Sequence, residues 1–237
     1  MRLLAFDSTA KIASVAVRED GRTLAAYTVD NGLTQSELLL PMAEDMLRSL
    51  KLGFDDIDCY ATSVGPGSFT GVRIGVSLIK GLAFGRDIPC VEVSTLEALA
   101  ENLRPIEGII VPCMDARRQQ VYNALFECSG GELHRLTEDR AISLMALAEE
   151  LKNYSDKKIY LSGDGYAIAK EYLDKAGVVC ECTPEALIGQ SALSVAVVAE
   201  RMAERGDTVS DRDISPVYLR LPQAERERLE RLKNERK

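Results

Sequence analysis

The sequence predicts an α/β protein made of two successive halves, each with the element order βββαβαβα. Three observations support this prediction. Short apolar runs of strand length alternate with longer segments in which apolar residues recur at helical spacing. A polar segment with a proline and a glycine, 104–108, divides the chain, and the same order of elements begins again after it. Each half also carries a turn flanked by glycines, at 65–67 and 163–165, between a strand and a helix.

The first half begins with a strand meander and continues with parallel crossovers. An Asp-Gly turn at 19–22 joins the second and third strands as a hairpin. Thr34 and Glu37 form a capping-box pattern at the start of the first helix, and Pro41 is expected to kink this helix or delay its regular start. The expected elements are strands at 3–7, 14–18 and 23–29, a helix from 34 to 50, a strand at 59–64, a helix at 68–84, a strand at 90–93 and a helix at 94–103.

The second half repeats this order and sets the expected domain organisation. Its expected elements are strands at 109–114, 120–126 and 132–136, a helix at 144–153, a strand at 158–162, a helix at 165–175, a strand at 178–182 and a helix at 192–205. We therefore expect an N-terminal subdomain over 1–104 and a second subdomain over 105–206. A C-terminal segment, 207–237, is expected to return to the first subdomain.

The segment around 64–75 is open to two interpretations. Its glycines and the helix start that follows could let backbone N–H groups approach an anion. Alternatively, Gly65 and Gly67 only make a tight turn from strand to helix, with Ser68 as the N-cap. The helix itself is apolar over most of its circumference, so we expect it to be covered on two sides. Gly71 and Gly75 would let a neighbouring helix or a second chain approach closely.

Two such halves are the plan of the actin, Hsp70 and sugar-kinase ATPase fold, the ribonuclease H-like class, in which a nucleotide lies in the cleft between the halves. Ala116, Arg117 and Arg118 stand where glycines would normally admit a phosphate, so we expect a degenerate nucleotide site. The two arginines could instead hold an anion directly. Asp7 and Asp115 each end an apolar strand, and for both a functional and a structural role stay open. The candidate nucleotide-binding residues are Asp7, Ser8, Thr9, Gly65, Gly67, Asp115, Arg117, Gly163 and Gly165.

Composition excludes several classes of function. The formal net charge of −8 argues against a broad nucleic-acid surface, which would need clustered Lys and Arg. His134 is the only histidine, and no G-x-S-x-G segment occurs, so neither a H-E-x-x-H metalloprotease nor a serine peptidase is expected. We predict no metal site. Because no signal peptide or membrane span is recognisable, we expect a cytoplasmic protein with no membrane partner.

The cysteines and the C-terminus each leave an alternative. The six cysteines form no C-x-x-C pair, which favours buried free thiols. Cys180 and Cys182 would share one face of a strand, so a metal or redox role is the alternative for this pair. Residues 224–237 read as a charged helix with a net charge of +2, from six basic and four acidic side chains. This helix is either a docking arm or a solvated helix.

Three motifs closely resemble the bacterial TsaB family, formerly YeaZ. They are Gly65-Pro-Gly-Ser-Phe-Thr-Gly-Val-Arg-Ile-Gly75, the segment 114–118 and the segment 216–220, and the likeness extends in order over nearly the whole chain. The resemblance implies a non-catalytic member of the actin-like superfamily that pairs with its paralogue TsaD. With the ATPase TsaE, that pair installs threonylcarbamoyladenosine in tRNA. Many family members have His where this chain has Gln35, which leaves open whether a contact at the helix start is altered.

The resemblance also implies partners and an interface. A heterodimer with TsaD, a ternary complex with TsaE, a homodimer in the absence of the partner, and contact with tRNA only through the complex are expected. No cofactor is firmly implied, and ATP or ADP could lie at the partner interface or in the degenerate cleft. The alternative function is an ATP-dependent small-molecule kinase or ATPase of the actin-like superfamily. No catalytic residue is expected, and the implied partner interface consists of Leu39, Met42, Met46, Gly71, Val72, Gly75, Val76 and Ile79.

Overall fold

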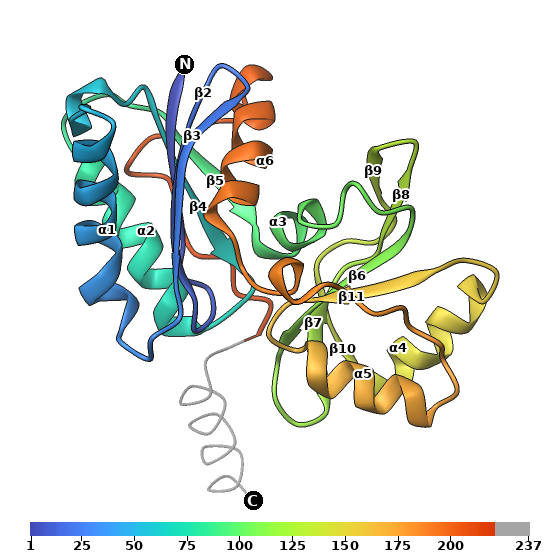
Figure 1. Cartoon of the computed structure of the whole chain (residues 1–237). Coiled ribbons are helices and arrows are strands. Elements are labelled where there is room, and N and C mark those ends of the chain that lie inside the picture. The colour runs from blue at the N-terminus through green and yellow to red at the C-terminus, as the bar shows by residue number, and fades with distance from the viewer. Residues whose placement is uncertain (221–237) are drawn as a thin grey trace, which may run out of the picture.

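The computed structural model describes residues 1–220 of the 237, which form two lobes, each with its own sheet (Figure 1). The first sheet has five strands in the order β3-β2-β1-β4-β5. Strands β1, β2 and β3 form an antiparallel meander, and β4 and β5 add in parallel beside β1. The strands are β1 (Arg2–Asp7), β2 (Ala13–Glu19), β3 (Arg22–Val29), β4 (Cys59–Gly65) and β5 (Cys90–Ser94).

Both faces of the first sheet are covered by helices, which explains why β4 and all of β1 after Arg2 are buried. Helices α1 (Gln35–Ser49) and α2 (Phe69–Ala83) cover one face, and α6 (Ala192–Glu204) covers the other (Figure 1). Successive side chains of β1 alternate between the two layers: Leu4 packs under α1 and α2, whereas Leu3 and Ala5 pack under α6. The capping box of Thr34 and Glu37 begins α1 as expected.

The second sheet has six strands. Its order is β10-β7-β6-β8-β9, and β11 pairs with β6 in parallel. Helices α4 and α5 cover one face of this sheet, and α3 lies against the other face. The elements are β6 (Gly108–Asp115), β7 (Gln120–Asn123), β8 (Phe126–Ser129), β9 (Glu132–Arg135), β10 (Arg140–Ser143), β11 (Ile159–Ser162), α3 (Thr95–Glu101), α4 (Leu144–Leu151) and α5 (Tyr166–Lys175).

The second half departs from the predicted elements at three places. The strand expected at 120–126 is divided into β7 and β8. Between them, Leu125 N donates to the Thr137 side chain and Leu125 O accepts from Leu136 N, so Leu125 does not pair with a neighbouring strand. Strand β10 was not predicted. The strand expected at 178–182 is wrong: this segment makes one backbone hydrogen bond to β11, from Glu181 N to Ile159 O. Cys180 is buried and Cys182 is exposed, so the two thiols do not share a face.

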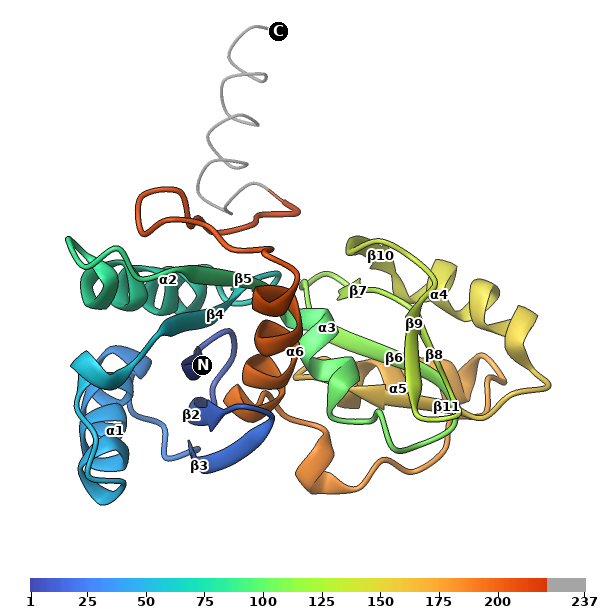
Figure 2. The same cartoon turned by 90° about the horizontal axis from the view of Figure 1, so that it is seen from above.

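Helix α6 lies outside the subdomain to which the sequence boundary at 206 assigned it. Its alanines and valines pack on the first sheet against Leu3, Ala5 and their neighbours, and Arg18 of β2 forms an ion pair with Glu200 at 2.8 Å. The chain then continues along the first lobe, where Val209 pairs with Cys90 and Ile214 is fully buried. Figure 2 shows this segment running alongside β5 and α2. The helix predicted at 224–237 lies outside the described residues.

Helix α3 joins the two lobes. Its apolar residues Leu96 and Leu99, with Leu103 just after its end, pack with Ile110 and Phe126 of the second sheet. The other side of α3 contacts α6 (Figure 2).

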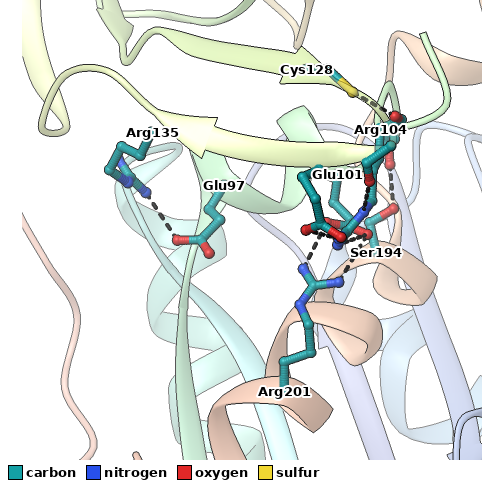
Figure 3. Close-up of polar contacts among 10 residues, drawn as sticks. Glu97, Glu101, Arg104, Cys128, Arg135, Ser194 and Arg201 are labelled. Carbon is teal, nitrogen blue, oxygen red and sulfur yellow. Dashed lines mark hydrogen bonds and ion pairs between the residues drawn. The ribbon is translucent and has the colours of Figure 1, made fainter. Parts of the chain in front are cut away.

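Charged groups reinforce this junction, as Figure 3 shows. The buried Glu101 accepts hydrogen bonds from both terminal nitrogens of Arg201 at 3.1 and 2.7 Å, and Arg104 adds a weaker ion pair at 3.4 Å. Arg135 of β9 contacts Glu97 at 3.0 Å. These contacts join α3, α6 and the β8–β9 hairpin, so charged groups connect the two lobes on this side.

Five of the six cysteines are buried, as the sequence predicts for free thiols, and Cys182 is exposed. Burial raises the pKa of Cys59 to about 12 and that of Cys90 to about 11, which keeps both as unreactive thiols at neutral pH. Among residues 1–220, no helix is long and apolar enough to cross a bilayer. Within the same range, no three His, Cys, Asp or Glu side chains gather as metal ligands would.

Candidate functional site

The loop after β1 holds three predicted nucleotide-binding residues, Asp7, Ser8 and Thr9, and all three are buried. Asp7 Oδ1 accepts hydrogen bonds from Thr9 N at 2.9 Å and Thr9 Oγ1 at 2.7 Å. Asp7 Oδ2 accepts one from Ser63 Oγ at 2.7 Å, and Ser8 Oγ donates to Gly71 O at 2.8 Å. Because their polar groups bond inside the chain, these residues stabilise the loop and do not present themselves to a ligand.

Burial raises the pKa of Asp7 above its ordinary 3.8, and the hydrogen bonds from Thr9 and Ser63 only partly oppose this. The folded state therefore binds the proton more tightly than the unfolded chain does. The stability linked to this proton is fully present below about pH 4 and is lost as pH rises through the folded-state pKa.

We predict that Asp7→Asn removes this loss of stability. Asparagine has nearly the same shape, can still accept from Thr9 and can donate to Ser63 Oγ, and it carries no buried charge at neutral pH. Urea unfolding between pH 4 and pH 8 should show the variant gaining stability relative to wild type as pH rises. Parallel profiles for the two proteins would contradict the assignment of a penalised, buried carboxylate.

The glycines of the two strand-to-helix turns serve packing inside the chain. A side chain at Gly67 would lie 2.7 Å from Thr9 O, and one at Gly65 would lie 2.5 Å from Val217 O. In the second half, a Cβ added at Gly163 or Gly165 would lie 2.2 or 2.9 Å from Cys113 O. Ser68 accepts a hydrogen bond from Gly71 N at 3.2 Å, so it is the N-cap of α2. The tight-turn interpretation fits these contacts.

A cleft of about 370 Å³ lies between the lobes, beside the start of α2. Of the nine predicted nucleotide-binding residues, Gly67, Asp115 and Arg117 line it. The other residues that line the cleft were not predicted as nucleotide-binding, and they include the polar side chains of Asp164, Tyr122, Tyr218 and Arg220. The one local signal for Asp164 was its position between the turn glycines Gly163 and Gly165. Tyr218 and Arg220 lie in the motif at 216–220.

The loop at the cleft's second-lobe side is strained. Three exposed residues, Arg117, Arg118 and Gln119, have φ values of 64°, 56° and 56°, which residues other than glycine rarely adopt. Asp115 holds this loop, because its carboxylate accepts from Arg117 N at 2.7 Å and pairs with the Arg117 guanidinium at 3.0 Å. Asp164 Oδ1 accepts from Asp115 N at 2.9 Å, and burial raises the pKa of Asp164. Asp115 therefore stabilises the conformation of this loop.

The residues predicted for the partner interface lie largely inside this chain, although Leu39 also lines a groove between α1 and α2. All eight residues are buried within this chain, where they pack α1 and α2 on the first sheet; they are Leu39, Met42, Met46, Gly71, Val72, Gly75, Val76 and Ile79. A Cβ added at Gly75 would lie 2.6 Å from Thr62 Oγ1 of β4. Gly75 therefore allows α2 to pack closely on its own sheet. Apolar periodicity identified the inward face of each helix, since that face is the more continuous one.

The outer sides of the same two helices form an apolar groove of about 590 Å³, here called the α1–α2 groove. Leu40, which is 37% exposed, and the half-buried Ile74 and Leu78 supply much of its apolar surface. Its lining residues are Gln35, Ser36, Leu39, Leu40, Phe69, Thr70, Arg73, Ile74, Ser77 and Leu78. Gln35 donates its side-chain amide to Ala10 O at 2.5 Å, so this residue ties the groove to the loop after β1.

An aromatic stack separates the groove from the cleft. The rings of Phe69 and Tyr218 lie 4.8 Å apart at 29°, and the guanidinium carbon of Arg73 lies 3.8 Å from the centre of the Phe69 ring. Arg73 Nε donates to Tyr218 OH at 2.7 Å. Phe69 lines both cavities, so the C-terminal segment reaches the edge of the helix groove.

The fold and site define an actin-like α/β protein in which the polar residues of the loop after β1 are turned inward. The family model for tRNA N6-adenosine threonylcarbamoyltransferase, TsaD, matches residues 34–228. The chain is 30% identical to the Bacillus subtilis tRNA threonylcarbamoyladenosine biosynthesis protein TsaB over 95% of this chain and 96% of that protein. For the Escherichia coli TsaB the identity is also 30%, over 93% and 95%.

A solved structure agrees with these sequence relatives. YeaZ from Pseudomonas aeruginosa superposes with a TM-score of 0.74 at 25% identity, covering 92% of this chain and 99% of that one. The chain belongs to the TsaB family of tRNA threonylcarbamoyladenosine biosynthesis proteins. The family resemblance and the fold class predicted from the sequence are thereby confirmed.

Proposed function

We propose that the chain is a non-catalytic subunit of the complex that makes threonylcarbamoyladenosine in tRNA, and that it supports a TsaD-type transferase. The α1–α2 groove is the observation that carries this proposal, because it is larger than the interlobe cleft and most of its accessible surface is apolar. A groove of this kind accepts a helix from a partner. The inward-turned side chains of Asp7, Ser8 and Thr9 support a role other than phosphate transfer.

The proposed partner is a TsaD-type protein because this chain itself matches the TsaD family model over most of its length. Two related folds can pair through equivalent helices about an approximate two-fold axis. The same geometry would let two copies of this chain pair when the transferase is absent. With a net charge of −8, the chain would approach tRNA through the complex, and TsaE would complete a ternary assembly.

Purified chain, mixed with the TsaD-type transferase of the same organism, tests the proposal by size-exclusion chromatography with light scattering. We expect a complex of defined stoichiometry. We also expect the transferase, supplied with TsaE, tRNA and the activated threonylcarbamoyl donor, to form modified tRNA only when this chain is added. Normal modification without the chain, or the absence of any complex, would overturn the proposal.

The alternative, an ATP-dependent kinase or ATPase, predicts a different result. Calorimetric titration of the isolated chain with ATP and Mg²⁺ would then show binding in the interlobe cleft and turnover abolished by Arg117→Ala, a residue that lines it. Under the proposed function the isolated chain should show no turnover. Binding of ATP or ADP only after the transferase is added would instead locate the nucleotide at the partner interface.

A further inference from the structure

Arg73 is held in one orientation at the edge of the α1–α2 groove. Its guanidinium stacks on Phe69, its Nε donates to Tyr218 OH at 2.7 Å, and its carbon lies 5.7 Å from the centre of the Tyr218 ring. Tyr218 is itself positioned by the C-terminal segment, because Val217 N donates to Val64 O at 2.8 Å. A long, exposed arginine usually samples many rotamers, and these contacts remove most of that freedom.

No carboxylate within residues 1–220 forms an ion pair with Arg73, whose guanidinium contacts the rings of Phe69 and Tyr218. The bond to Tyr218 OH is the one hydrogen bond that the guanidinium makes within these residues. Within residues 1–220, both terminal nitrogens are therefore free to donate, side by side, to one carboxylate. By contrast, Arg48 at the opposite end of α1 already pairs with Asp45 at 2.8 Å.

We propose that Arg73 is the specificity-determining cation of the α1–α2 groove, and that it pairs with a carboxylate on the partner helix that occupies the groove. Tyr218 is a positioning residue that holds the guanidinium in place. The partner surface that fits combines apolar side chains, for Leu40, Ile74 and Leu78, with one Asp or Glu at the end next to Phe69. This inference rests on the proposed function and extends the docking surface to a third element, the segment 214–220.

The test compares full-length variants for affinity to the TsaD-type transferase by biolayer interferometry at two salt concentrations. Arg73→Glu should weaken binding by more than about 100-fold, and Arg73→Ala by about 10- to 100-fold, since one bidentate charged contact is lost. The Arg73→Ala complex should also be less sensitive to salt than the wild-type complex. Arg48→Glu reverses a charge on the same helical layer outside the groove, and it should bind as wild type does.

Tyr218 variants separate positioning from folding. Tyr218→Phe keeps the ring stack and loses the hydroxyl that accepts from Arg73, so about 3- to 10-fold weaker binding is expected with an unchanged melting temperature. Adding Tyr218→Phe to Arg73→Ala should then cost nothing further. If wild type binds and Arg73→Glu binds equally well, the inference is overturned while the proposed function stands. If wild type forms no complex, both fall.

Discussion

Replacing Gly71 with alanine is expected to lower the free energy of unfolding by about 3 kcal/mol, near the upper end of the range for overpacking a well-packed site. A Cβ at this position would lie 1.9 Å from Ser8 O and 3.1 Å from Ser8 C. The clash is with backbone, and Ser8 is held in place because its own hydroxyl donates to Gly71 O. Neither α2 nor the loop after β1 can therefore yield without breaking the other's contacts.

Gly81 provides a matched control on the same helix. It is exposed near the end of α2, and no atom lies within 4 Å of a Cβ built there. Gly81→Ala should therefore raise the free energy of unfolding, by up to about 1 kcal/mol, through the higher helix propensity of alanine. Thermal unfolding of a chain this size should place Gly71→Ala about 6–12 °C below wild type. Equal melting temperatures for the two glycine variants would contradict the packing role of Gly71.

Much of the fold followed from local sequence signals. The Thr34 and Glu37 capping box, the Asp-Gly turn at 19–22 and Ser68 as N-cap are all determined by residues within four positions of one another. Strands β1 and β4 are buried on both faces, so they contain few charged residues and are easily recognised. Where these signals are strong, predicted and observed elements differ by one or two residues.

The errors arose where contacts distant in sequence decide the outcome. Residues 178–182 have the composition of a strand, yet only Glu181 N bonds to β11, whereas Val178 N bonds back to Leu173 O of α5. Helix α6 reads as part of the second half, but its alanines fit closely on the first sheet. In a single sequence nothing distinguishes a helix that packs on the sheet before it from one that crosses to another lobe.

The site was harder to predict than the fold for the same reason. Asp7 ends an apolar strand, which suits both a phosphate loop and a buried structural carboxylate, and only the bonds from Thr9 and Ser63 distinguish the two. On α2, the most apolar stripe marks the buried side. The face open to a partner is marked by a weaker and interrupted pattern, Phe69, Ile74 and Leu78, mixed with Arg73 and Thr70.

The double variant Leu40→Gln with Leu78→Gln is expected to weaken binding of the transferase by about 100-fold or more, because two apolar contacts at the centre of the proposed interface would be replaced by amides without partners. Leu40 is 37% exposed and Leu78 is half-buried, and each lies on the outer side of its helix. Glutamine is a good helix former, so α1 and α2 should keep their structure. Affinity measured by calorimetry, together with the melting temperature of each protein, tests this.

Two comparisons make the result specific. Met145 and Val179, which are 65% and 83% exposed, lie on the second lobe away from the groove, so Met145→Gln with Val179→Gln should leave affinity unchanged. Val76, only 3% exposed, is two residues from Leu78 on α2, and Val76→Gln should lower the melting temperature because an amide would enter the core. The reverse pattern, with binding lost through Val76 alone in a fully stable protein, would mean that the partner contacts the inward face and that α2 leaves its sheet on binding.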